Sequence, residues 1–61
     1  DLAVVLANRP PARANYDAFA PSTRRNILGW VASAVRPQTR AKRIQRIATD
    51  SEQGLRTPTN G

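Results

Sequence analysis

Apolar residues recur three or four positions apart in several stretches of the chain. Because an α-helix turns once every 3.6 residues, such a series places its apolar side chains on one face. The strongest series lies in residues 22–35, where Ile27, Trp30, Val31 and Ala34 form one stripe. The other series occupy residues 2–8, 11–19 and 37–53. No stretch alternates apolar and polar residues over a useful length, so the pattern predicts an all-α fold, a small bundle of three to four short helices.

Prolines and one glycine mark the predicted helix boundaries. Asp1 can cap the first helix, and Arg9 ends it because the residue before a proline disfavours the helical conformation. Pro21 and Pro37 suit the first turns of the third and fourth helices, since proline needs no partner for a backbone N–H there. Gly54 is a natural stop for the fourth helix, because glycine readily adopts the left-handed conformation that ends helices.

A single domain is expected from 61 residues. Residues 1–53 are predicted to form a helical module, and residues 54–61, which are polar and aperiodic, a disordered tail. The predicted core comprises Leu2, Val5, Leu6, Tyr16, Phe19, Ile27, Trp30, Val31, Ala34, Ile44 and Ile47. Because the chain has no cysteine, no disulfide can reinforce so small a core. This suggests support from a neighbouring domain of the same polypeptide or from a second copy.

Residues 36–47 concentrate positive charge, with five of the ten basic residues and no acid. On a helical projection, Arg40 borders the apolar face and Arg43 lies to one side, whereas Lys42 points away from that face. In the third predicted helix, Arg24 borders the apolar stripe and Arg25 faces solvent. Arginines at the borders of two packed helices can form a fork for an anion. Arg24, Arg25, Arg40, Lys42 and Arg43 are therefore the candidate residues for binding an anion or a partner.

A structural interpretation of the same arginines stays open. Arg24 and Arg40 could each cap the carboxyl end of a helix, stack on Trp30 or Tyr16, or pair with Asp17. The two interpretations differ in where the guanidinium groups point. An anion site requires Arg24 and Arg40 to face one concave edge between the third and fourth helices.

Catalytic chemistry has no visible basis in the sequence. The chain contains no histidine and no cysteine, so no serine has a recognisable base and no metal has its usual nitrogen or sulfur ligands. The four acidic residues are scattered, and no glycine-rich phosphate loop is present. We therefore expect no catalytic residues, no bound metal and no cofactor, and predict that the chain is not an enzyme by itself.

The net charge of +6 favours acidic partners such as nucleic acid or acidic protein surfaces. A protein, or a neighbouring domain of the same polypeptide, is the first partner expected; nucleic acid or another anion is the alternative, and a homo-oligomer is also compatible. No apolar run approaches the ~20 residues of a membrane span, and the amino-terminal residues do not read as a signal peptide. A cytoplasmic location is the expectation.

The stretch from Phe19 to Ile44 resembles the bacterial YdeI/OmpD-associated family, also called OmdA, whose name refers to bacteriocin protection. The resemblance rests on Phe19, Pro21, Ser22, Arg24, Arg25, Leu28, Trp30, Val31, Pro37, Thr39, Arg40, Arg43 and Ile44. It extends more weakly over about residues 2–48. Where the family often has glutamate, this chain has Gln38, which removes a favourable negative charge from the start of the fourth helix. Ala20 also replaces a frequent serine or threonine.

The resemblance implies an all-helical module that is often the carboxyl-terminal part of a longer bacterial protein. The family name records a genetic association rather than a mechanism. Two functional hypotheses follow: a non-enzymatic helical interaction module, or a binder of nucleic acid or anionic ligands through its arginine-rich surface. Salt distinguishes them, because phosphate binding weakens steeply with added salt whereas apolar docking does not.

Overall fold

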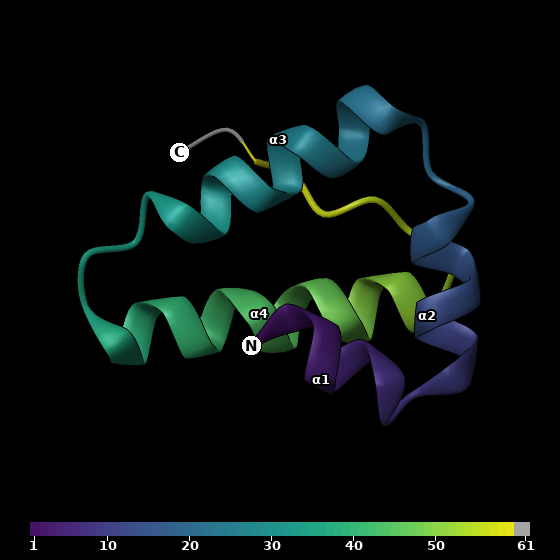
Figure 1. The fold of residues 1–61 in the computed structure, drawn as a ribbon, viewed down its shortest axis with the longest axis horizontal. Coiled ribbons are helices and arrows are strands. Elements are labelled where there is room, and N and C mark those ends of the chain that lie inside the picture. The colour runs from purple at the N-terminus through teal and green to yellow at the C-terminus, as the bar shows by residue number, and fades with distance from the viewer. Residues whose placement is uncertain (60–61) are drawn as a thin grey trace.

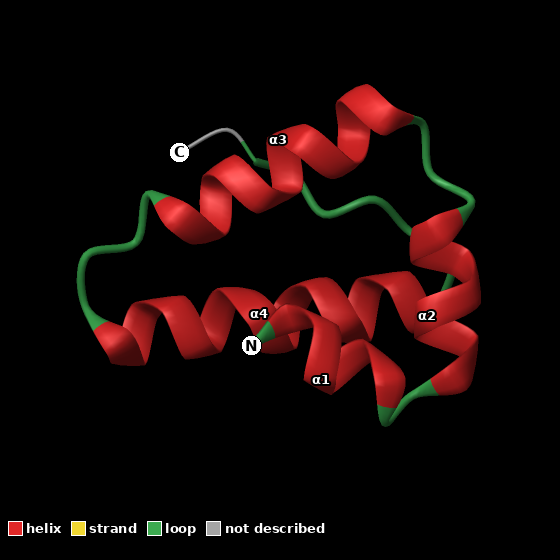
Figure 2. Cartoon of the chain, viewed as in Figure 1, coloured by secondary structure: helices red, strands yellow, loops and turns green. Residues whose placement is uncertain are grey.

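Four helices make up the computed structural model, which describes residues 1–59. They are α1 (Leu2–Ala7), α2 (Pro10–Asp17), α3 (Pro21–Ala32) and α4 (Pro37–Glu52). The described residues contain no strand, as Figure 2 shows, so the predicted all-α class is confirmed. No helix in this part of the chain is long and apolar enough to cross a membrane.

The helix ends follow the local chemistry of the sequence. The carboxylate of Asp1 accepts a hydrogen bond of 3.0 Å from the backbone N–H of Val4 and so caps α1. The other three helices each open on a proline and have no side-chain cap. After α4, Gly54 has a φ of +76°, and the N–H of Leu55 donates to the carbonyl of Asp50 at 2.8 Å. This reversal ends α4 at the predicted glycine.

Two helices are shorter than the sequence pattern predicted. The second ends at Asp17 rather than at Phe19, and the third ends at Ala32 rather than at residue 35. Pro37 prevents α3 from continuing directly into α4, because Arg36 before it is extended, with φ −87° and ψ 138°. Ala34 is nevertheless buried, so its predicted place in the core holds although it lies in the connection to α4.

The longest helix, α4, is the support on which the other three pack. In Figure 1, α1 crosses α4, α2 stands near the carboxyl-terminal end of α4, and α4 runs back along α3 after the turn at residues 33–36. Arg9, in the turn before α2, reaches Glu52 of α4 at 3.5 Å and Gln45 at 3.4 Å. The side chain of Asn15 donates to the carbonyl of Ser51 at 2.7 Å, which ties α2 to the last turn of α4.

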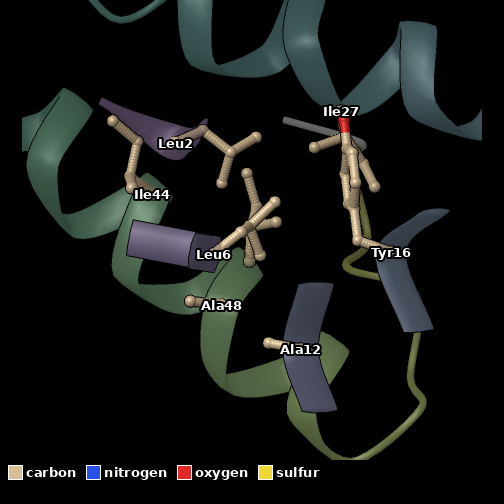
Figure 3. Packing of buried hydrophobic residues seen from close by; sticks show 8 residues of the cluster. Leu2, Leu6, Ala12, Tyr16, Ile27, Ile44 and Ala48 are labelled. Atoms are coloured by element: carbon tan, nitrogen blue, oxygen red, sulfur yellow. The ribbon is translucent and has the colours of Figure 1, made fainter. Parts of the chain in front are cut away.

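Side chains from all four helices form the core shown in Figure 3. Seven of the predicted core residues are buried: Leu2, Leu6, Tyr16, Ile27, Ala34, Ile44 and Ile47. The other four are only partly buried and pack against the edge of the core: Val5, Phe19, Trp30 and Val31. Small residues fill the helix contacts instead, since Ala12 and Ala48 are fully buried. Short side chains let the backbones approach closely, which leaves less room between the helices for further large side chains.

Residues 55–59 return toward α3 after the turn at Gly54 (Figure 1). They have no regular secondary structure, yet Thr57 is only 5% exposed, and its hydroxyl donates to the carboxylate of Asp50 at 2.9 Å. The expectation that the whole tail is free of packing therefore needs correction at Thr57, where a polar residue is buried through a side-chain partner that periodicity does not reveal. The division of the chain at residue 53 stays a prediction, and residues 60–61 lie outside the described residues.

We expect Thr57→Val to lower the free energy of unfolding by about 1 kcal/mol, because it removes a hydrogen bond to a half-buried carboxylate. Thr39→Val is the matched control, since Thr39 is partly exposed and has no side-chain hydrogen bond among the described residues. Urea denaturation measures both variants. Equal stability of the two variants would show that residues 55–59 contribute nothing through Thr57.

Candidate functional site

Two of the candidate arginines hold the carboxyl end of α3. Arg43 donates from Nη1 to the carbonyl of Trp30 at 2.6 Å and to the hydroxyl of Ser33 at 2.9 Å. Its guanidinium also lies over the indole of Trp30, 4.8 Å from the ring centroid. Arg40 donates from Nη2 to the carbonyl of Ala34 at 3.1 Å. Carbonyls at a helix end carry partial negative charge, so Arg40 has a role that the structural interpretation offered for it, and Arg43, for which no such role was predicted, has the same one.

The other two arginines lie at the opposite end of α3. Arg24 and Arg25 line a shallow hollow between α2 and α3, together with Arg13 and Tyr16. Asp17 also lines this hollow, and its carboxylate pairs with Arg13 at 3.0 Å. The Nε of Arg24 is buried and has no hydrogen-bond partner among the described residues. Three arginines therefore gather at this hollow.

The structure does not bring Arg24 and Arg40 to one edge. Arg40 binds the carbonyl of Ala34, beyond the carboxyl end of α3, whereas Arg24 lies near the amino end of this helix. The eight residues from Arg24 to Ala32 span about 12 Å of helix. Lys42 is exposed on α4 and makes no ion pair within residues 1–59. The five candidates thus divide into a clamp at one end of α3, a hollow at the other end and one exposed lysine. Whether any of them binds an anion stays a prediction.

The position of Tyr16 beside this hollow shifts the pKa of its side chain. Burial raises the pKa of its phenol above the ordinary value of about 10, although the nearby guanidinium of Arg24 acts in the opposite direction. A group whose pKa is higher in the folded state stabilises the fold below its unfolded pKa and loses that contribution as the pH rises through the folded value. The folded protein should therefore lose stability above pH ~10.

This pH dependence is testable with Tyr16→Phe, which removes the ionisable hydroxyl and retains the ring. The melting temperature of the parent protein should fall more steeply between pH ~9 and ~11 than that of the variant. An identical fall in both proteins would show that Tyr16 does not govern the alkaline loss of stability.

An apolar groove lies where α1, α3 and α4 meet, and the sequence analysis did not predict it. The groove has a volume of about 600 Å³. It is lined by Asp1, Leu2, Ala3, Leu28, Val31, Val35, Pro37, Arg40, Ala41 and Ile44. Leu28 is 53% exposed and Val35 is 92% exposed. The sequence did carry a signal, because both residues widen the apolar stripe of the third helix beyond what a core this small can cover.

Two arginines lie at the end of this groove near the α3–α4 turn, and Asp1 is the acidic residue that lines it. The carboxylates of Asp17, Asp50 and Glu52 each form an ion pair, with Arg13, Arg46 and Arg9 respectively. Residues 18–49 contain seven basic residues and no acid. Arg40 lines the groove, and Arg36 lies between two residues that line it. The carbonyl that Arg40 binds is uncharged, so this side chain still presents its full positive charge.

Comparison with protein-family models decides which family this arrangement represents. The model described as "OmdA: Bacteriocin-protection, YdeI or OmpD-Associated" matches residues 1–54. The chain belongs to the OmdA family. The match covers all four helices, so the resemblance noted in the sequence is confirmed. Among curated proteins and among solved structures, no significant match is found.

The residues that carry the resemblance acquire structural roles in this OmdA chain. Trp30 packs against the core and beneath the guanidinium of Arg43, and Arg40 binds the carbonyl of Ala34 in the turn into α4. Pro21 and Pro37 open α3 and α4. Much of the pattern therefore builds the α3–α4 corner. By contrast, Leu28 belongs to the same pattern but is half exposed in the groove.

Proposed function

We propose that this OmdA chain is a non-enzymatic interaction module that docks a protein, or a neighbouring domain of the same polypeptide, through the groove between α1, α3 and α4. The observation that carries the proposal is the apolar groove with two large exposed side chains, Leu28 and Val35. Contiguous apolar surface exposed by a soluble domain marks interaction sites. A chain of 61 residues also has little core of its own and gains stability from a partner.

The non-enzymatic part of the proposal follows from the chemistry of the side chains. The chain has no histidine and no cysteine, and three of its four carboxylates already take part in ion pairs. The groove is lined by apolar side chains apart from Asp1 and Arg40. General acid–base chemistry needs a titratable group placed against the substrate, and Asp1 and Arg40 are the charged side chains among the described residues that line this groove.

Photo-crosslinking in cells tests the interaction. A photoreactive phenylalanine derivative introduced at position 28 or 35 should yield a discrete protein adduct, because both positions project from the groove. The same derivative at Ala14, an exposed residue of α2 outside the groove, is the control. Absence of a protein adduct at both groove positions, or an identical adduct at Ala14, would overturn the proposal.

Binding of an anionic ligand is the second candidate function, and the hollow between α2 and α3 favours it. Three arginines gather there, and one carboxylate compensates one of them. The buried Nε of Arg24 has a donor to offer. In this second candidate function, Arg24 and Arg25 together bind the anion, instead of the pair Arg24 and Arg40.

Titration with a short single-stranded oligonucleotide, followed by fluorescence anisotropy, tests the second candidate. Phosphate binding predicts a logarithmic affinity that falls linearly with the logarithm of the salt concentration. Arg24→Gln and Arg25→Gln should weaken binding, and Lys42→Gln, which removes the same charge far from the hollow, should weaken it less. Equal losses in all three variants would indicate a general effect of net charge and no site in the hollow.

A further inference from the structure

We infer that the occupant of the groove is an acidic amphipathic protein segment, a short helix with an apolar face and carboxylates along its border. This inference rests on the proposed function and specifies the chemistry of the partner. It follows from the shape of the groove, from the polarity of its lining and from the charge at its border.

The groove suits an apolar side-chain stripe better than a small polar molecule. A volume of about 600 Å³ lies in the range of ligand sites. Small-molecule sites, however, fix their ligands through several converging polar groups, and here only Asp1 and Arg40 contribute charged side chains. Leu28 from α3 and Ala41 from α4 both line the groove, so the groove lies between two helices. A cleft between two helices is the kind of surface into which amphipathic helices dock.

Charge selects an acidic partner. Arg36 and Arg40 lie at the α3–α4 turn, where Val35 and Pro37 line the groove. No acid between residues 18 and 49 compensates them, and the other carboxylates apart from Asp1 are held in ion pairs elsewhere. Carboxylates beside the apolar face of a partner would meet these arginines at the rim, where opposite charges speed association and exclude wrong partners.

The same charge argues against two other occupants. A second copy would bring another +6 charge toward the groove and repel it. An anionic lipid surface complements the charge, but a membrane-bound helix presents a convex apolar face to lipid, whereas Leu28 and Ile44 line a concavity. Both occupants remain measurable outcomes of the experiment below.

The experiment uses a synthetic peptide of about 14 residues, ~21 Å as a helix, with leucines on one face and glutamates beside them. Its binding to the full chain is measured by isothermal titration calorimetry. Val35→Asp and Leu28→Asp should each weaken binding at least about tenfold. A peptide with lysines in place of the glutamates should bind at least about tenfold more weakly than the acidic one.

Two exposed apolar residues outside the groove provide matched controls. Val4 is 58% exposed and Leu55 is 54% exposed, against 53% for Leu28, and neither lines the groove. Val4→Asp and Leu55→Asp change the net charge by the same amount as the groove variants. Both should bind the acidic peptide with parental affinity, and circular dichroism should show the parental helix content in all four variants.

Three results would overturn the inference. The first is equal loss of peptide binding in groove and control variants, which would reduce the interaction to net charge. The second is that the protein binds phosphatidylglycerol vesicles more tightly than the peptide and that Val35→Asp abolishes this vesicle binding. The third is self-association in analytical ultracentrifugation that Val35→Asp abolishes. If the acidic peptide fails while crosslinking at positions 28 and 35 still gives an adduct, the partner has another chemistry and the proposed function stands.

Discussion

Ile47→Ala is expected to leave a large fraction of this protein unfolded at physiological temperature. Ile47 is fully buried in α4, among side chains of the other helices. Truncating a buried isoleucine to alanine costs about 2–5 kcal/mol, since the transfer free energy is lost and a cavity remains. A chain of 61 residues has a free energy of unfolding of about 3–9 kcal/mol. The loss therefore approaches the whole stability of the domain.

Thermal melts followed by circular dichroism measure this effect. A domain of this size loses about 4–8 °C in melting temperature for each kcal/mol. Leu28→Ala is the control, because Leu28 is half exposed in the groove and its truncation should change stability by no more than about 0.5 kcal/mol. If Ile47→Ala melts within a few degrees of the parent protein, the core does not lie on this face of α4.

Trp30→Ala is expected to have the second largest effect, about 3 kcal/mol, which is the lower end of the range for truncating a large aromatic residue. The lower end applies because Trp30 is only partly buried and packs at the edge of the core. Arg43→Ala should cost about 1.5–3 kcal/mol, since it removes charge-assisted hydrogen bonds to the carbonyl of Trp30 and to Ser33.

The two losses should not add. Arg43 stacks on the ring of Trp30, so Trp30→Ala already removes one of its contacts. A double-mutant cycle in urea should give a coupling free energy of about 0.5–1 kcal/mol. Lys42→Ala, one position away on the exposed face of α4, should cost no more than about 0.5 kcal/mol. Additivity of Trp30→Ala and Arg43→Ala would show that the clamp does not act as a unit.

The arrangement of the helices was accessible from the sequence because each of them has an independent local signal. Pro21 and Pro37 set two boundaries, Gly54 set another, and Asp1 supplied the first cap. Burial was harder to predict. Periodicity shows which face a residue occupies but not how closely two helices approach, so it placed Trp30 in the core centre instead of at the edge.

The candidate site was less accessible because it depends on contacts between helices. A helical projection placed Arg24 and Arg40 at the borders of their apolar stripes. The groups that each guanidinium contacts, however, depend on the position of the arginine along its helix. Arg40 lies in the first turn of α4, beside the end of α3, and therefore meets carbonyls. Leu28 and Val35 widen the apolar stripe of the third predicted helix, and only the packing of α1 and α4 shows that they line a groove.

Nuclear magnetic resonance shift mapping tests most directly whether the groove is the interaction site of this OmdA chain. The ¹⁵N-labelled protein is titrated with the acidic amphipathic peptide, and backbone amide shifts are recorded residue by residue. The largest changes should occur at Ala3, Leu28, Val35 and Ala41, which line the groove from α1, α3, the α3–α4 turn and α4 respectively. Changes centred instead on Arg13, Arg24 and Arg25 would place the site in the arginine hollow and contradict the groove.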